Sequence, residues 1–139
     1  MVLLVDDEHE FVNALADRLA LRGLDVDTAP DGQIALAKTA RRAYDAVLLD
    51  MAMPGMDGVA TLSAMLAANP GLQVIILTGQ ASLRQGVEAM KLGALDLIEK
   101  PADIDDLVRR IDDAAHRRLS LERERVQERV QDIMRRKGW

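Results

Sequence analysis

The sequence predicts an α/β fold in which helices cover both faces of a parallel sheet. Three short runs, residues 2–5, 46–49 and 74–77, are apolar at every position, which is typical of strands buried on both faces. Between these runs lie segments whose apolar residues recur at helical spacing. Strands that alternate with helices favour a doubly wound sheet with right-handed crossovers.

The first half of the chain predicts two strands, each followed by a helix. The helix after residues 2–5 stops at Gly23, a usual position just past a helix end. Its apolar residues are Phe11, Val12, Leu15 and Leu19. Residues 24–28 alternate apolar or Thr side chains with Asp, which predicts a half-buried edge strand. A turn at residues 30–32 leads to a second helix, which ends near two arginines at 41–42.

The second half continues the alternation. A third helix follows the strand at 46–49 and its loop, and it ends before residues 69–71, Asn-Pro-Gly. The strand at 74–77 is followed by a helix closed by Gly93 and by a short strand at 94–98. Five strands and five helices then predict a flavodoxin-like, doubly wound parallel sheet in the order 2-1-3-4-5.

An extended C-terminal helix completes the predicted fold. Asp103, with Asp106 three residues on, resembles a capping box at its start, and the next glycine or proline is Gly138. At 1.5 Å per residue, such a helix is on the order of 50 Å long and leaves the domain. We therefore expect a folded domain over residues 1–118 and a helical extension over 119–139.

Composition excludes several classes of protein. The 139 residues, 49% hydrophobic, suit one domain with a core and no second one. Cysteine is absent, which excludes disulfides, a thiolate nucleophile and a cysteine metal site. The apolar start lacks the basic residues of a signal peptide, and no apolar run approaches membrane-spanning length. We expect a soluble, cytoplasmic protein that does not contact a membrane.

The charge is unevenly distributed. Residues 1–113 carry 10 Lys and Arg against 19 Asp and Glu, a net charge of -9, whereas residues 114–139 carry 8 against 4, a net charge of +4. The acidic globular part is a poor candidate for binding a phosphate backbone, so no direct DNA binding is expected. One Trp, one Tyr and one Phe leave little for stacking bases or a flavin.

Polar side chains follow four of the five predicted strands. They are Asp6, Asp7, Asp50, Thr78 and Lys100. In open α/β sheets this edge binds ligands, and the first and third strands place three carboxylates together there. Carboxylates this close cannot all stay ionised and unpaired, and Mg²⁺ suits them better than zinc in a chain with no Cys and two His. A hydroxyl, an ammonium and a metal around a carboxylate would stabilise a phosphoryl group arriving on it.

Short motifs stand at these strand ends and before them. They are Val5-Asp6-Asp7-Glu8, Leu49-Asp50 with Met53-Pro54-Gly55-Met56-Asp57-Gly58, Leu77-Thr78-Gly79, Gly93-Ala94 and Lys100-Pro101. Together they resemble the response-regulator receiver domain of two-component signalling, over about residues 2–115. Residues 87–94 and 98–101 are most similar to receivers of the nitrogen-regulation and nitrogen-fixation types. Those usually carry an output domain, for which this chain has no room, so we expect receiver chemistry and not transcription.

The resemblance implies that Asp50 accepts a phosphoryl group from a histidine kinase or phosphotransfer protein, and that the chain signals through protein–protein interaction. It also implies a Mg²⁺ site. Its ligands would be Asp7 directly, Asp6 mainly through water, Asp50 and the backbone carbonyl of Ala52. The side chains implied to contact the phosphoryl oxygens are those of Thr78 and Lys100.

Other positions follow from the same resemblance. Gln80 is expected near the attacking water, and the chain is expected to catalyse only its own phosphorylation and slow dephosphorylation. The Lys100-Pro101 bond is expected to be cis, against about 5% of such bonds in general. Leu97 stands where the family usually has Tyr or Phe, so a rotating ring cannot act as the switch; Leu97 either packs or moves in a smaller version of that step.

Three alternatives remain open from the residues. A small aspartyl-phosphate hydrolase needs a second Asp two residues after the first, where this chain has Ala52. A flavodoxin lacks support because the stacking aromatics are missing. A docking module of the same fold would not be phosphorylated at all. Mg²⁺-dependent labelling separates them, since slow hydrolysis favours the receiver, fast turnover the hydrolase and no labelling the docking module.

An apolar stripe continues along the C-terminal extension. Its residues are Leu119, Val126, Val130 and Ile133, at spacings of seven, four and three. A stripe beyond the domain edge needs a partner, so we expect a homodimer through the C-terminal helix. The alternative is a solvated, partly frayed helix in a monomer.

Overall fold

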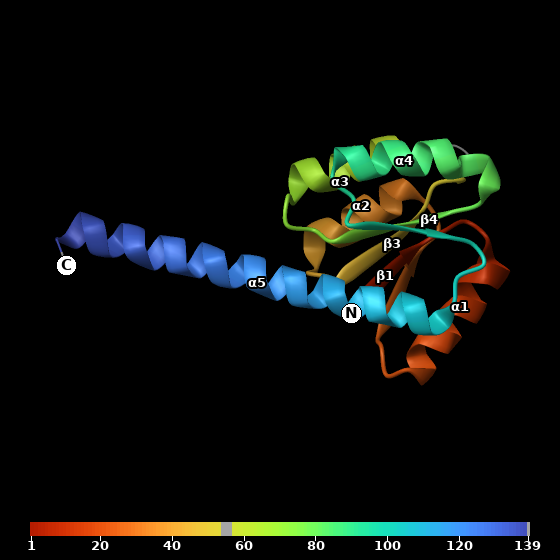
Figure 1. Cartoon of the computed structure of the whole chain (residues 1–139), viewed down its shortest axis with the longest axis horizontal. Coiled ribbons are helices and arrows are strands. Elements are labelled where there is room, and N and C mark those ends of the chain that lie inside the picture. Colours follow the sequence, from red (N-terminus) through yellow and green to blue (C-terminus); the bar gives the residue numbers. More distant parts are fainter. Residues whose placement is uncertain (54–56, 139) are drawn as a thin grey trace.

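A five-stranded parallel sheet forms the centre of the molecule, seen in a computed structural model (Figure 1). The structure describes residues 1–53 and 57–138, without the side chain of Gln80; the Pro54-Gly55-Met56 part of the motif and Trp139 lie outside the described residues. The strands are β1 (Val2–Val5), β2 (Val26–Ala29), β3 (Ala46–Asp50), β4 (Val74–Thr78) and β5 (Asp96–Glu99). Their order is β2-β1-β3-β4-β5 with parallel pairing throughout, which confirms the predicted topology.

Helices cover both faces of the sheet. They are α1 (His9–Leu21), α2 (Gly32–Arg41), α3 (Gly58–Ala68), α4 (Leu83–Leu92) and α5 (Ile104–Lys137), with a short 3₁₀ helix, η1 (Gln80–Ser82), between β4 and α4. The first face carries α2, α3 and α4, and the opposite face carries α1 and α5 (Figure 1). The flavodoxin-like fold and the long C-terminal helix are as predicted.

Side chains of the central strands alternate between two apolar cores. In β1, Leu3 and Val5 belong to the core beneath α2, α3 and α4, whereas Val2 and Leu4 belong to the core beneath α1 and α5. All four are buried. Because both faces exclude water, these strands are apolar at every position, which is the pattern seen in the sequence.

The edge strand β2 begins at Val26, two residues later than predicted. Gly23 takes a left-handed φ of 83° just past α1. The N–H of Leu24 then donates to the carbonyl of Leu19 at 3.2 Å. Leu24 therefore closes the end of the helix, and strand pairing starts only after it.

The capping box predicted at the start of α5 is only half formed. The Asp103 carboxylate accepts the N–H of Asp105 at 3.0 Å, as a cap should. Asp106 pairs instead with Arg109 and with Arg110, whose Nε lies 3.1 Å away. Two guanidinium partners one turn further along are stronger donors to a carboxylate than a backbone N–H, so the second half of the prediction was wrong.

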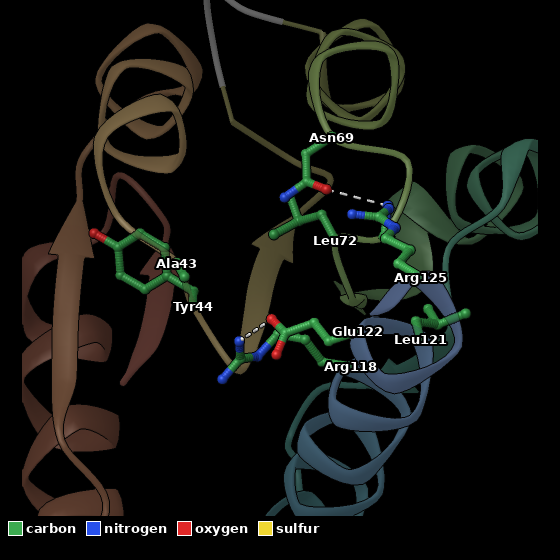
Figure 2. Close-up of a pocket in the computed structure, with 9 residues that line it drawn as sticks. Ala43, Tyr44, Asn69, Leu72, Arg118, Leu121, Glu122 and Arg125 are labelled. Carbon is green, nitrogen blue, oxygen red and sulfur yellow. Dashed lines mark hydrogen bonds and ion pairs between the residues drawn. The ribbon is translucent and has the colours of Figure 1, made fainter. Parts of the chain in front are cut away.

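The last helix runs past the edge of the sheet (Figure 1). Its 34 residues span about 51 Å. Arg118 ties it to Asp45 at 2.6 Å. Arg125 points toward Asn69 in the turn between α3 and β4, where its Nη2 lies 3.0 Å from the place that a Cβ on Gly71 would occupy (Figure 2). Contacts with the body therefore continue past residue 118 to Arg125. In the part of the chain that the structure describes, no helix is both long enough and apolar enough to cross a membrane.

A polar cluster secures the edge strand β2. The Tyr44 hydroxyl donates to Asp27 Oδ2 at 2.8 Å, and the Lys38 ammonium donates to Asp27 Oδ1 at 2.8 Å. Tyr44 itself is only 2% exposed. Burial, followed by the hydrogen bond to Asp27, raises the pKa of Tyr44 to about 12.

Tyr44 is the only tyrosine in the chain, so the ultraviolet absorbance of tyrosinate reports on it alone. We predict a titration midpoint near pH 12 in the folded protein and near the ordinary value of 10.0 in denaturant. Because the folded-state pKa is the higher one, the stabilisation from this group is complete below pH 10 and is lost as the pH rises through about 12. Asp27→Asn should lower the folded midpoint. A protein that is folded by circular dichroism and titrates near pH 10 would contradict the prediction.

Candidate functional site

The carboxyl ends of four strands bring the predicted polar residues to one edge of the sheet. β1 continues into Asp6 and Asp7, and β3 ends on Asp50 beside it. β4 ends on Thr78, whose carbonyl accepts the N–H of Lys100 at 2.8 Å just after β5. This edge lies where the strand order reverses, between β1 and β3, the usual ligand position in such sheets.

Asp6, Asp7 and Asp50, which we call the acidic cluster, face one another. One oxygen of each carboxylate lies within 4.8 Å of the other two. Asp6 and Asp50 are each 2% exposed, and Asp7 is half-buried. Backbone N–H groups orient two of them: Glu8 donates to Asp6 Oδ1 at 3.0 Å, and Ala52 donates to Asp50 Oδ1 at 3.3 Å.

Lys100 inserts its ammonium between two of these carboxylates. Nζ lies 3.1 Å from Asp6 Oδ2 and 3.4 Å from Asp50 Oδ1. The same nitrogen lies 4.2 Å from the centre of the Phe11 ring on α1, a cation–π contact that adds to the two carboxylate contacts. One ammonium beside three carboxylates leaves the cluster with an excess of negative charge.

This excess changes the acid–base properties of the site. Burial, and then the charge of Asp6, raises the pKa of Asp50 above its ordinary value, and Lys100 offsets the effect only in part. Burial alone would lower the pKa of Lys100, but its hydrogen bond to Asp6 and the charge of Asp50 outweigh burial and raise that pKa. Lys100 is therefore a permanent cation at neutral pH. Its positive charge does not fully balance the negative charge of Asp50 and Asp6.

The donor set fits a hard divalent cation. The acidic cluster offers only carboxylate oxygens, which Mg²⁺ prefers, and Mg²⁺ typically binds through one or two carboxylates together with water. The raised pKa of Asp50 marks uncompensated negative charge that a cation would offset. Ala52 is exposed and follows Asp50 by two residues, so its backbone lies beside the same cluster.

Thr78 lies at this edge, but its hydroxyl bonds to the loop that follows it. The side chain is fully buried, and Oγ1 lies 2.6 Å from the Ser82 hydroxyl and 3.0 Å from the Gly79 carbonyl. Among the described residues, the polar partners of the Asp50 carboxylate are the Ala52 N–H and Lys100. The structure thus brings the acidic cluster and Lys100 together, and it leaves the Thr78 hydroxyl bonded elsewhere.

Leu97 packs against α4 through a glycine. A Cβ added to Gly86 would overlap Leu97 Cδ1 and would lie 3.7 Å from Thr78 Cβ. Glycine at this helical position therefore allows α4 to approach the ends of β4 and β5 closely. The Lys100-Pro101 peptide bond is cis, as the resemblance implied.

Two residues of the site do not follow from the sequence patterns. Helical spacing places Phe11 only on the apolar face of the first helix, although its position one turn after Asp7 is a signal that it lies near the strand end. Ser82 escapes prediction because a serine in a connecting loop carries no distinctive pattern. The Gln80 side chain lies outside the described residues, so its place near the attacking water stays a prediction.

Similar proteins agree with this geometry. The response regulator receiver domain family matches residues 2–112. The chain is 42% identical over 106 residues to the transcriptional regulatory protein ZraR of Escherichia coli O157:H7, and 40% identical over 108 residues to the DNA-binding transcriptional regulator NtrC of Salmonella typhimurium. These alignments cover 76% and 78% of this chain but 24% and 23% of those proteins. The chain thus spans about a quarter of the length of these curated relatives.

Solved structures agree with both the fold and the motifs. The receiver domain of NtrX from Brucella abortus superposes with a TM-score of 0.78 at 34% identity, covering 84% of this chain and 98% of that one. A CheY-like receiver domain protein from Methanospirillum hungatei JF-1 superposes with a TM-score of 0.79 at 28% identity, covering 86% and 95%. Fold, strand-end residues and family match coincide over most of the sequence. The chain therefore belongs to the response-regulator receiver family of two-component signalling.

Proposed function

We propose that Asp50 accepts a phosphoryl group from the phosphohistidine of a histidine kinase or phosphotransfer protein. The observation that carries this proposal is the buried Asp50 carboxylate, with two carboxylates within 4.8 Å and an ammonium at 3.4 Å. An Asp50 oxygen attacks phosphorus, the phosphorus–nitrogen bond breaks, the imidazole leaves, and an acyl phosphate remains. The chain then signals through contacts with another protein.

The neighbours of Asp50 supply the charge that this transfer needs. The acidic cluster and the Ala52 carbonyl would hold Mg²⁺, which when bound offsets the negative charge of the carboxylates and of the incoming phosphoryl group. Lys100 adds a fixed positive charge, and the Thr78 hydroxyl would donate to a phosphoryl oxygen. Phosphoryl transfer depends mainly on positioning and charge, so these groups suffice.

The proposal limits the chemistry to the chain itself. Receiver domains are generally not enzymes that act on a separate substrate, and this chain would catalyse only its own phosphorylation and slow dephosphorylation. A hydrolase would need an acid at position 52, where the exposed Ala52 offers none. A docking module that is never phosphorylated would have no use for two buried carboxylates beside a half-buried ammonium, because charged groups are costly to desolvate.

The helical extension, residues 119–139, has a separate role in this proposal: it pairs two copies of the chain. The apolar stripe Leu119, Val126, Val130 and Ile133 is exposed along it. A second copy presents the same stripe, which makes it the matching partner. Glu122 already pairs with Arg118 at 2.8 Å, and Arg125 lies against the body. Charge pairing between copies therefore falls to other charged residues of the extension.

Phosphorylation by acetyl phosphate tests the acceptor. Asp50→Asn should reduce labelling at least ~100-fold, because the amide is not a nucleophile, and the wild-type chain should label only with Mg²⁺ present. The matched control is Asp57→Asn, since Asp57 is exposed and caps α3, a task that Asn performs equally well. Labelling of Asp50→Asn at the wild-type rate would show that another residue accepts the phosphate.

The lifetime of the phosphorylated state tests Gln80. Ala52 has no polar side-chain group to orient an attacking water, so this role falls to Gln80, two residues past Thr78. Gln80→Ala should slow dephosphorylation by about tenfold, equivalent to about 1.4 kcal/mol in the barrier. The decay of pre-labelled protein after removal of the donor gives the rate. An unchanged decay would remove Gln80 from the mechanism.

Sedimentation of the full chain tests the extension. Val130→Glu puts a charge on the apolar stripe and should convert the dimer to monomer at micromolar concentration. Gln131→Glu adds the same charge at the next, also exposed position and should leave the dimer intact. A wild-type chain that is monomeric both with and without phosphorylation would exclude the extension as a pairing element.

A further inference from the structure

The buried hydroxyl of Ser82 lies at an unexpected place in the loop after β4. Ser82 is 4% exposed, and its Oγ lies 2.6 Å from Thr78 Oγ1. It also accepts the N–H of Gly79 at 3.2 Å and can donate to the Gly79 carbonyl at 3.3 Å. Among the side chains that the structure describes, only that of Ser82 hydrogen-bonds to the Thr78 hydroxyl.

The hydrogen of the Thr78 hydroxyl is donated within the group formed by Thr78, Ser82 and Gly79. The Thr78 and Ser82 hydroxyls have one hydrogen each, and the acceptors within reach among the described residues are the two hydroxyl oxygens and the Gly79 carbonyl. Either Thr78 donates to Ser82, which donates to Gly79, or Ser82 donates to Thr78, which donates to Gly79. In both arrangements the Thr78 hydrogen is used within this triangle, so it is not directed at Asp50.

Ser82 does not serve the role that its position suggests. It is the residue just before α4, where serine usually accepts a backbone N–H from the first helical turn, yet its side chain makes no such bond. Its φ of -112° and ψ of 12° differ from the extended backbone that a cap requires. The hydroxyl is therefore directed back toward Gly79 and Thr78.

Among the described side chains, those packed near Thr78 beside α4 offer no competing partner. Leu97 and Gly86, which pack there, have no polar side-chain group. An aromatic residue with a hydroxyl at position 97 could bond a polar neighbour, but Leu97 cannot. Among the described side chains, Ser82 is thus the one that can hold the Thr78 hydroxyl.

We infer that Ser82 is a positioning residue that holds the Thr78 hydroxyl away from Asp50 until a phosphoryl group displaces it. This inference rests on the proposed phosphorylation of Asp50. When Thr78 turns to donate to a phosphoryl oxygen, its bond to Ser82 breaks, whereas the bonds between Ser82 and Gly79 can remain. The Thr78–Ser82 bond therefore stabilises only the resting arrangement, and it opposes binding of the phosphoryl group.

The size of the effect follows from one hydrogen bond. The Thr78–Ser82 hydrogen bond exists in the resting state but not when Thr78 donates to a phosphoryl oxygen. A hydrogen bond with a net free energy of ~1 kcal/mol changes the equilibrium between these two states about fivefold. Removing the Ser82 hydroxyl should therefore tighten binding of a phosphoryl mimic about fivefold. The probe is beryllofluoride with Mg²⁺, titrated into the full chain and followed by calorimetry.

Four variants separate positioning from general stability. Ser82→Ala should bind beryllofluoride about fivefold tighter than wild type, and Ser82→Thr, which keeps a hydroxyl, should stay near the wild-type affinity. Ser63→Ala, at an exposed serine on α3, should change nothing. In a Thr78→Ala background, Ser82→Ala should have no further effect, because the partner of Ser82 is already gone.

The outcomes are distinct. Unchanged or weaker binding by Ser82→Ala overturns the inference, as does tighter binding that persists in the Thr78→Ala background. If wild type binds no beryllofluoride and accepts no phosphate, the proposed function itself fails; if wild type does both, only the role of Ser82 is in question. Should Ser82→Ala not fold, Ser82→Cys replaces it, since a thiol is of similar size and bonds more weakly.

Discussion

Negative charge gathered at the ends of β1 and β3 is the constraint on which the site depends. Asp6 and Asp50 are buried, so water screens their charges poorly, and Lys100 offsets only part of them. The surroundings compensate part of this excess: Phe11 makes a cation–π contact with the Lys100 ammonium, and the Glu8 N–H donates to the Asp6 carboxylate. This excess of negative charge would be lowered by a bound cation and raised by a phosphoryl group.

At this edge the sheet fixes the backbone of the site residues, whereas the loop after β4 binds the Thr78 side chain. Parallel strands with two buried faces hold Asp50 and the backbone of Thr78 in a fixed register. The side chain of Thr78, however, is hydrogen-bonded to the loop through Gly79 and Ser82. Thr78 thus links the sheet to the segment that leads into α4. If the Thr78 hydroxyl changed its hydrogen-bond partner, this segment would lose a hydrogen bond.

The long last helix joins the body to the extension without a break. Its first turns pack on the sheet through Leu107, Ile111 and Ala114, and Arg118 and Arg125 carry the contact to the opposite end of the domain. Beyond that point the helix is exposed (Figure 1). Because the helix is continuous, no break separates the part packed on the sheet from the exposed extension.

The sheet and the residues at its edge follow from the amino-acid sequence alone. Fully apolar runs imply strands buried on both faces, and parallel strands must end at one edge, so the pattern of residues is enough to place the strand-end side chains together. These side chains are Asp6, Asp7, Asp50, Thr78 and Lys100. The partners of these side chains, in contrast, depend on tertiary packing: Phe11 lies against Lys100, and Ser82 bonds to Thr78. The same holds in α5, where Asp106 pairs with two arginines instead of capping the helix. Periodicity reports which residues are buried, whereas a hydrogen-bond partner is chosen by competition among several groups that only the tertiary structure brings within reach.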